Sequence, residues 1–155
     1  MTNPAVNVHA TAAVIGTSGF LFVGPSGSGK TMLALSCIAA ARHCGLFAAL
    51  VSDDQVLMSL HNGRAIARRP ASIAGLAEIR GSRIIAVETI PAAVIDFAIL
   101  PVKSPFEPRL APENEQFSLP SGEFLPLYRL PFGEGLNSFE ILRLILPQNA
   151  NFQGQ

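Results

Sequence analysis

The sequence predicts one α/β domain organised around a strand, a glycine-rich loop and a helix that follow one another in the first third of the chain. The strand is Phe20 to Val23, a short β-prone run that glycines bound. The loop, Gly24-Pro25-Ser26-Gly27-Ser28-Gly29-Lys30-Thr31, fits the phosphate-loop pattern G-x-x-x-x-G-K-[ST]. The Ala- and Leu-rich run from Met32 to Ala41 predicts the helix. This order is typical of a P-loop nucleotide-binding core.

The chemistry of nucleotide binding explains why these segments come in this order. Glycines let the backbone wrap closely around a phosphate, with several N–H groups pointing inward. The helix begins at the same place, so its unpaired N–H groups and the positive end of its dipole face the same anion. In this pattern Lys30 reaches the β/γ-phosphates and the hydroxyl of Thr31 holds Mg²⁺. We therefore expect ATP and Mg²⁺ as cofactors; the alternative, a Gly/Ser turn before a helix, requires a chance match of roughly one per cent.

The length and composition bound the class of protein. A chain of 155 residues suits a single domain that buries about two-thirds of its unfolded surface. Charged residues make up 14% of the chain, against a usual share of about a quarter. So little charge leaves apolar surface to pack against other copies, and we expect a homo-oligomer. The formal net charge of zero predicts no general attraction to nucleic acid or to membranes.

No targeting or membrane-spanning segment is recognisable in the sequence. The N-terminal residues lack a basic region followed by an apolar one, and no apolar run reaches membrane-spanning length. We therefore expect a cytoplasmic protein. Cys37 and Cys44 lie on one predicted helix, where packed thiols are expected rather than a disulfide. The three histidines form no zinc pattern.

A second strand carries two acidic residues at its end. Leu46 to Val51 is a continuous apolar run, which predicts a strand covered on both faces. It runs directly into Asp53 and Asp54. In P-loop enzymes a strand that ends in aspartate presents a carboxylate to Mg²⁺ or to the attacking group. The alternative is a turn with an Asx bond, but two adjacent acids downstream of a phosphate loop favour the functional interpretation.

The remaining elements follow from β-prone runs and turn signals. Asn62-Gly63 between two β-prone runs predicts a hairpin of Val56 to Leu60 and Arg64 to Arg68. Residues 103–123 are rich in Pro and Glu and predict a loop without much regular structure. Further strands are expected at Val8 to Ile15, Ile84 to Val87, Val94 to Val102 and Leu125 to Leu130, with helices at Ala71 to Ala77 and at Ser138 to Leu146, the latter capped by Ser138. Together they predict a flexible arm over residues 1–8, one P-loop domain over residues 9–147, which the resemblance described next identifies as a kinase domain, and a flexible tail over residues 148–155.

The ordered motifs resemble the catalytic domain of HPr kinase/phosphorylase, the bacterial enzyme that phosphorylates a serine of the phosphocarrier protein HPr. The resemblance runs from His9 to about Leu146 and matches the short form in some α-proteobacteria, which lacks the N-terminal regulatory domain. It implies a nucleotide core of the HPr kinase/phosphoenolpyruvate carboxykinase type, HPr as the partner and a hexameric homo-oligomer. It rests on His9, the phosphate loop, Asp53-Asp54, Glu78-Ile79-Arg80-Gly81 and Arg109-Leu110.

The resemblance also implies a role for each site residue. Asp54 would be the base that takes the proton of the target serine, and Glu78 would bind Mg²⁺ together with Thr31. Asp53 would support the metal or the loop. His9 and Arg109 would be further catalytic groups, with Arg109 stabilising charge on the transferring phosphoryl group. Without the resemblance, His9 is a polar residue near a strand and Arg109 is a loop cation that pairs with Glu107.

Two departures from the family pattern bear on the activity. His9 is followed by Ala10 where the family has glycine. Residues 131–137 stand where the family has Pro-Val-[RK]-Pro-Gly-Arg-Asn, the loop linked in the family to dephosphorylation, and both basic residues are missing. The sequence therefore predicts a kinase with weak or absent phosphorylase activity, unless Arg129 takes the place of these cations. The alternatives are a degenerate nucleotide sensor that binds ATP and a partner without turnover, and a small-molecule P-loop kinase.

Overall fold

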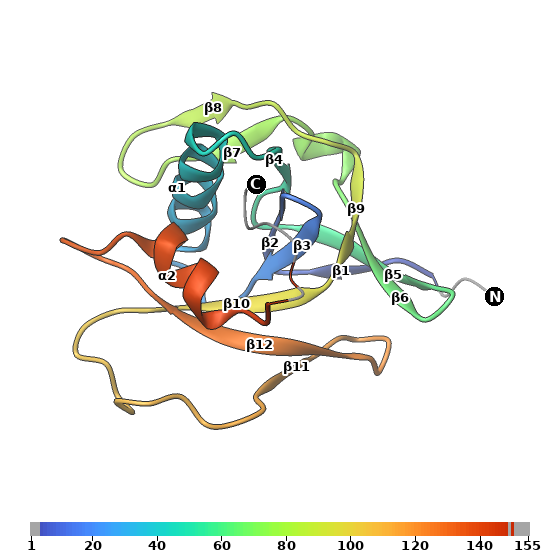
Figure 1. Ribbon diagram of the computed structural model, residues 1–155. Helices are drawn as coiled ribbons and strands as arrows, with labels where there is room; N and C mark the ends of the chain where they lie inside the picture. The colour runs from blue at the N-terminus through green and yellow to red at the C-terminus, as the bar shows by residue number, and fades with distance from the viewer. Residues whose placement is uncertain (1–3, 149, 151–155) are drawn as a thin grey trace.

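The computed structural model describes residues 4–148 and 150 of the chain, and Figure 1 shows their arrangement. The elements in chain order are β1 (Val6–Val8), β2 (Thr11–Ile15), β3 (Ser18–Phe22), α1 (Lys30–His43), β4 (Ala48–Ser52), β5 (Val56–His61), β6 (Arg64–Arg68), a 3₁₀ turn (Ala71–Ile73), β7 (Leu76–Glu78), β8 (Ile84–Ala86), β9 (Ala92–Ile95), β10 (Phe97–Val102), β11 (Gln116–Ser118), β12 (Phe124–Pro131) and α2 (Ser138–Ile145). Neither helix is long and apolar enough to cross a membrane.

Two sheets and two helices stack in three layers (Figure 1). The central sheet has six strands in the order β11-β12-β10-β3-β2-β4; α1 and α2 cover one of its faces, and a four-stranded sheet, β1-β5-β6-β9, covers the other. Strands β3, β10 and β12 run parallel, and β2 is antiparallel to both β3 and β4. The carboxyl ends of β12, β10, β3 and β4 therefore meet at one edge, which is where open α/β sheets bind ligands.

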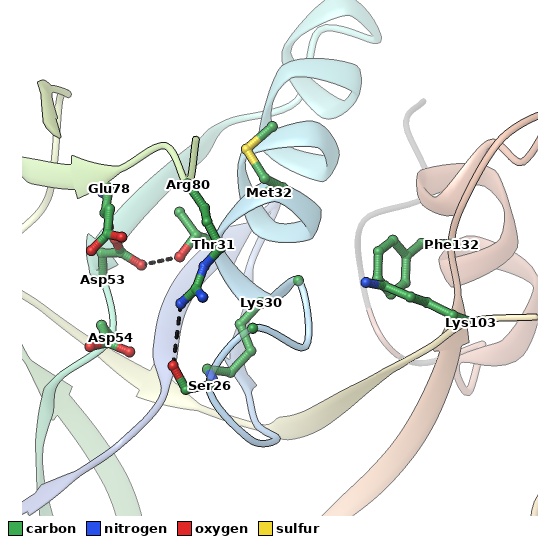
Figure 2. Close-up of a pocket in the computed structure, with 12 residues that line it drawn as sticks. Ser26, Lys30, Thr31, Met32, Asp53, Asp54, Glu78, Arg80, Lys103 and Phe132 are labelled. Carbon is green, nitrogen blue, oxygen red and sulfur yellow. Dashed lines mark hydrogen bonds between the residues drawn. The ribbon is translucent and has the colours of Figure 1, made fainter. Parts of the chain in front are cut away.

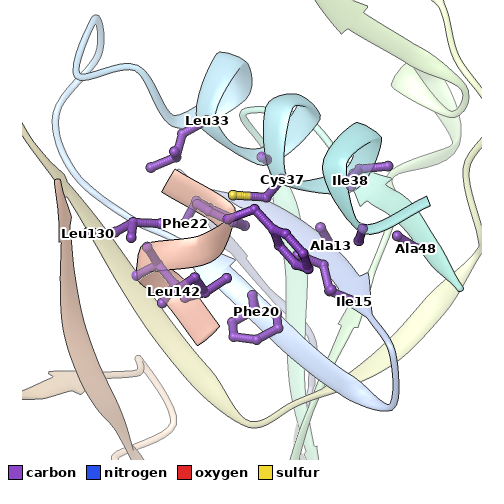
Figure 3. Packing of buried hydrophobic residues seen from close by; sticks show 14 of the residues in the cluster. Ala13, Ile15, Phe20, Phe22, Leu33, Cys37, Ile38, Ala48, Leu130 and Leu142 are labelled. Atoms are coloured by element: carbon purple, nitrogen blue, oxygen red, sulfur yellow. The ribbon is translucent and has the colours of Figure 1, made fainter. Parts of the chain in front are cut away.

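Strand β3 is buried on both faces because its alternate side chains belong to two different cores. Phe20 and Phe22 pack under the helices against Leu33, Cys37 and Leu142 (Figure 3). Leu21 faces the opposite way and joins the core between the two sheets. Burying side chains of this size stabilises the fold by about 1.5–3 kcal/mol each. The strand that leads into the glycine-rich loop is therefore firmly anchored.

Several elements agree with the expectations from the sequence. Helix α1 ends two residues before Gly45, and β4 lies within two residues of the predicted strand with every residue buried. The β5–β6 hairpin turns at Asn62 and Gly63, whose φ angles are 51° and 76°. A type I′ turn requires positive φ at both of its central residues, which explains the Asn-Gly pair.

The N-terminal expectations are partly wrong. Val6–Val8 form β1 and pair with β5, so this part of the chain is not a loose arm. The run from Val8 to Ile15 is not one strand, because the chain passes between the two sheets at His9 and Ala10. The amide of Ala10 donates to the carbonyl of Asp54, 3.2 Å away, and fixes the crossing beside the end of β4. Residues 1–3, 149 and 151–155, part of the predicted arm and tail, lie outside the described residues.

The predicted strand Val94 to Val102 also divides between the sheets, at Asp96. The carboxylate of Asp96 accepts a hydrogen bond from the amide of Gly19 at 2.9 Å, and its amide donates to the carbonyl of Gly19 at 2.8 Å. A side chain at Gly19 would place its Cβ 1.8 Å from the carbonyl oxygen of Val94, so only glycine fits there. Apolar composition is the same on both sides of Asp96, which is why the break is hidden in the sequence.

Three smaller differences concern local structure. The predicted helix Ala71 to Ala77 is a 3₁₀ turn followed by β7, because Gly75, with φ of 76°, ends the turn and β7 pairs with β8. The long loop contains β11, which pairs with β12. Helix α2 is capped by Asn137 rather than Ser138: the Asn137 side chain accepts from the amide of Glu140 at 3.2 Å, while the Ser138 hydroxyl donates to the carbonyl of Pro131.

Both cysteines are free thiols, as expected, but their surroundings differ. Cys37 is fully buried, and burial raises the pKa of its thiol to about 12, whereas Cys44 is exposed. Since the thiolate is the reactive form, we expect the native protein at pH 8 to release one equivalent of thionitrobenzoate from DTNB per chain, and two after denaturation. Cys44→Ser should abolish the native signal and Cys37→Ser should leave it. Two rapidly reacting thiols in the native protein would contradict this assignment.

Candidate active site

A cavity of about 260 Å³ lies at the edge of the central sheet where the parallel strands end. It brings together the glycine-rich loop between β3 and α1, the end of β4, strand β7 and the residues that follow β10 and β12. Figure 2 shows how its side chains are arranged. The lining residues are Ser26, Gly27, Gly29, Lys30, Thr31, Met32, Asp53, Asp54, Glu78, Arg80, Lys103 and Phe132.

The glycine-rich loop has the features of an anion-binding loop. Gly29 is the N-cap of α1, with φ of 97°, and no side chain caps the helix. The first N–H groups of α1 therefore lack a capping side chain and lie at the positive end of the helix dipole. The hydroxyl of Ser28 is buried without a hydrogen-bond partner among the described residues. A buried polar group without a partner is costly, so this hydroxyl and the helix terminus both suit an anionic ligand.

Lys30 is 5% exposed and links the loop to the rest of the site. Its Nζ donates to the carbonyl oxygens of Gly24 at 2.9 Å and Pro25 at 3.0 Å. Burial lowers the pKa of Lys30, while the negative charges of Asp54 and Asp53 oppose this shift and the charge of Arg80 adds to it. The first residue of α1 thus holds a buried cation directly against the loop.

Asp53 is buried and accepts hydrogen bonds from three segments. Its Oδ1 accepts from the hydroxyls of Thr31 at 2.5 Å and Thr11 at 3.1 Å, and its Oδ2 accepts from the backbone amide of Glu78 at 2.9 Å. The contact with Thr31 is drawn in Figure 2. Because Thr31 donates its proton to Asp53, the lone pairs of its hydroxyl oxygen remain available to a cation. Asp53 therefore positions other groups and has little capacity left to act as a base.

Asp54 differs sharply from its neighbour. Its side chain is 58% exposed at the cavity, and its Oδ1 lies 3.3 Å from Nδ1 of His9. The other ring nitrogen of His9, Nε2, lies 3.4 Å from Nζ of Lys30. One tautomer satisfies both contacts: Nδ1–H donates to Asp54, and Nε2 accepts from Lys30. The imidazole thus joins the buried cation to an accessible carboxylate and orients that carboxylate.

Two residues of the Glu78-to-Gly81 segment reach the cavity. The side chain of Glu78 lies beside Asp53 at the end of β7. The guanidinium of Arg80 crosses over the loop, where Nη2 donates to the hydroxyl of Ser26 at 3.2 Å. Among the described residues, no group of three or more His, Cys, Asp and Glu side chains is placed to hold a metal ion by itself.

The predicted site residues are not all gathered in this cavity. His9 contacts two residues that line it, whereas Arg109 lines a second cavity together with Glu107 and Arg129. The guanidinium of Arg129 is bound at both ends by Glu115, with Nε to Oε1 at 2.7 Å and Nη2 to Oε2 at 3.0 Å. The guanidinium of Arg129 is therefore already paired and is not available to replace the two basic residues missing from the loop at residues 131–137. The placement of Arg109 gives no support to a catalytic role for it.

Four residues of the cavity were missed as site residues by the sequence analysis: Met32, Arg80, Lys103 and Phe132. Arg80 had been noted only as part of a motif, and Phe132 only as a replacement for a basic residue. Lys103 follows β10 and Phe132 follows β12, at the same edge of the sheet as the loop after β3. Lys103 and Phe132 could have been found from their position directly after a parallel strand, but this requires knowing which strands are parallel neighbours.

The fold and the cavity define a mixed α/β protein in which an anion-suited loop and a pair of carboxylates share one sheet edge. Among solved structures, that of the Hpr(Ser) kinase/phosphatase from Coxiella burnetii matches it with a TM-score of 0.72 and 24% sequence identity, over 90% of this chain and 87% of that chain. The chain therefore has the fold of that protein, which confirms at the level of fold the resemblance drawn from the sequence. The sequence itself matches no family model and no curated protein.

Proposed function

We propose that the protein is an ATP-dependent kinase that phosphorylates a serine of the phosphocarrier protein HPr. The observation that carries this proposal is the contact chain from Lys30 through His9 to Asp54, in the same cavity as the Thr31–Asp53 hydrogen bond. This contact chain connects a buried cation, which lies beside a loop suited to bind an anion, with an exposed carboxylate. The name of the Coxiella burnetii protein supplies the substrate, since a likeness in fold supports the same chemistry in this chain.

The cavity suits a nucleoside triphosphate with its last phosphate near Lys30. The backbone of residues 24–29 and the N-terminus of α1 would hold the phosphates. Lys30 has three N–H donors, of which two go to loop carbonyls and one points toward His9, so an incoming phosphate oxygen can replace one of these partners. Arg80, which lies over Ser26, adds a second cation on the exposed side of the loop.

The donor set also fits Mg²⁺. The hydroxyl oxygen of Thr31 and the carboxylate of Glu78 would hold the ion, with Asp53 acting through Thr31. Oxygen ligands are what Mg²⁺ prefers, and in kinases it is held by one or two protein groups together with substrate phosphates, which agrees with the sparse acidic set. When bound, the ion neutralises charge that develops on the phosphates.

Asp54 would act as the general base. The serine hydroxyl oxygen attacks the γ-phosphorus of ATP, the bond to the ADP oxygen breaks, and the serine proton passes to the carboxylate of Asp54. The base must be accessible and correctly oriented, and the exposure of Asp54 and its contact with His9 meet both needs. Asp53 does not, since three donors already occupy its oxygens.

The test is transfer from labelled ATP to purified HPr in the presence of Mg²⁺. We expect label on HPr, located on a serine by mass spectrometry, and none on an HPr variant in which that serine is alanine. Binding of ATP without transfer would instead favour a nucleotide sensor. ATP hydrolysis that depends on a small molecule, with no label on HPr, would favour a small-molecule kinase.

The reverse reaction is expected to be weak. Removing phosphate from serine with inorganic phosphate requires a second anion in the site, and arginine suits this task because its planar fork binds phosphate in a bidentate way. The loop after β12 brings Phe132 into the cavity, and the guanidinium of Arg129 is already occupied by Glu115. With serine-phosphorylated HPr and excess phosphate, we expect pyrophosphate to appear much more slowly than the kinase reaction proceeds. Equal rates would show that other cations hold the second anion.

The expected homo-oligomer, a hexamer on the resemblance, stays a prediction. Large apolar side chains are exposed on the described surface, among them Leu144 on α2 and Leu110 in the long loop, which are 83% and 69% exposed. These side chains would become buried in an interface between subunits, as the low charged fraction of the sequence also suggests.

A further inference from the structure

The two sides of the cavity, to either side of the glycine-rich loop, carry different kinds of side chain. The carboxylates of Asp53, Asp54 and Glu78 lie on one side of Lys30, and Lys103 and Phe132 lie on the other (Figure 2). The sequence has two lysines, and both line this one cavity. The second lysine and the aromatic ring have no part in the phosphoryl transfer described above, so their position calls for a separate role.

The polarity of the cavity sets the direction in which a nucleotide lies. The reacting phosphate must face Asp54, because the base has to be within hydrogen-bond reach of the attacking hydroxyl. The remaining phosphates follow the loop and the N-terminus of α1, and the nucleoside then leaves the site away from the carboxylates. That direction leads toward Lys103 and Phe132 (Figure 2).

We propose that Phe132 and Lys103 form the subsite for the nucleoside end of a nucleoside triphosphate. Phe132 stacks on the base, and Lys103 binds the phosphate nearest the ribose. The assignment rests on the proposed function, since it takes the nucleotide as ligand and Asp54 as the reacting end. Stacking on a phenyl ring does not distinguish one base from another, so the ligand class is a nucleoside triphosphate in general.

Phe132 is held where a stacking platform is needed. A Cβ added at Gly29 would lie 2.6 Å from the Cζ atom of Phe132, so the ring packs directly against the last glycine of the loop. The amide of Phe132 donates to the carbonyl of Val102 at 3.0 Å, which fixes its backbone to the end of β10. The ring is partly exposed at the cavity, so part of its surface remains accessible to a base.

Lys103 is an exposed cation that lies over this ring. Its Nζ is 5.1 Å from the ring centroid, a cation–π contact that is weak at an exposed site. A phosphate oxygen is a stronger partner for an ammonium group, and the flexible lysine stem can move from the ring face to that oxygen. The same movement clears the ring face for the base. Lys103 would thus exchange one partner for another when the nucleotide binds.

Calorimetric titration with two ligands, MgATP and magnesium tripolyphosphate, tests the subsite, because tripolyphosphate has the phosphates but no nucleoside. For Phe132→Leu we expect the affinity for ATP to fall about tenfold, as for loss of one base–aromatic stack, with tripolyphosphate affinity unchanged. Lys103→Met should weaken both ligands. Phe124→Leu, the same change at an exposed position at the other end of β12, is the matched control and should alter neither.

Other outcomes would overturn the subsite or the proposed function, and they can be told apart. If Phe132→Leu weakens both ligands equally, the ring only shapes the loop; if ATP affinity is unchanged, the base binds elsewhere. If Lys103→Met leaves both affinities unchanged, the ammonium does not bind phosphate. A wild-type protein that binds neither ligand would refute the proposed function together with the subsite. A protein that binds both ligands but transfers nothing to HPr would refute only the kinase activity.

Discussion

Replacing Asp54 with asparagine is expected to slow phosphoryl transfer to HPr by about 10²–10⁴-fold, the usual cost of losing a general base, while ATP still binds. Asparagine keeps the shape of the side chain and can accept a hydrogen bond from Nδ1 of His9 through its amide oxygen, so the surroundings of residue 54 are preserved. Its amide cannot take up the serine proton. The measurement is the single-turnover rate of transfer, with ATP affinity measured separately by calorimetry.

The neighbouring residue provides the matched control. In Asp53→Asn the amide oxygen must face the N–H of Glu78, so the NH₂ group faces the Thr31 and Thr11 hydroxyls. These hydroxyls must then accept instead of donate, which occupies a lone pair of Thr31 that would otherwise bind Mg²⁺. We expect this variant to require more Mg²⁺ for the same activity, which the Asp54 variant should not. If Asp54→Asn transfers phosphate at the wild-type rate while Asp53→Asn is inactive, the roles within the pair are reversed.

Removal of the Lys30 ammonium should have the other large effect. Lys30→Ala takes the cation away from the loop and leaves the carbonyls of Gly24 and Pro25 without this donor, so both ATP binding and transfer should be severely reduced. Lys30→Met retains most of the buried aliphatic chain and separates loss of charge from loss of packing. We expect the two variants to be similarly impaired in calorimetric titration with ATP. Unchanged affinity and turnover in both would refute nucleotide binding at this loop.

Local signals in the sequence were sufficient for the centre of the site. The glycine pattern places Lys30 and Thr31 at the start of a helix, and an apolar run that ends in two acids places Asp53 and Asp54 at the end of a strand. Both features depend on residues adjacent in the chain, so propensity and spacing can detect them. That these segments meet at one sheet edge follows from the parallel direction of β3 and β4.

Features that depend on which strands are neighbours could not be predicted. A β-prone run looks the same whether it stays in one sheet or crosses to another, so the divisions at His9 and Asp96 were missed. The crossing at His9 brings the imidazole beside Asp54, the proposed general base. Lys103 is an ordinary loop residue in the sequence, and only the pairing of β10 with β3 reveals that it stands beside the glycine-rich loop.

The hydrogen bonds at Asp53 couple the site to the folding of the chain. They join Asp53 to Thr11, Thr31 and Glu78, at sequence separations of 42, 22 and 25 residues. Contacts between such distant positions form only after the entropy cost of closing the intervening loops has been overcome, and they are typically slow to form. A partly folded chain can therefore contain an intact glycine-rich loop and still lack an ordered site. Appearance of activity during refolding should follow the slowest step of tertiary assembly, so that incompletely folded molecules remain inactive.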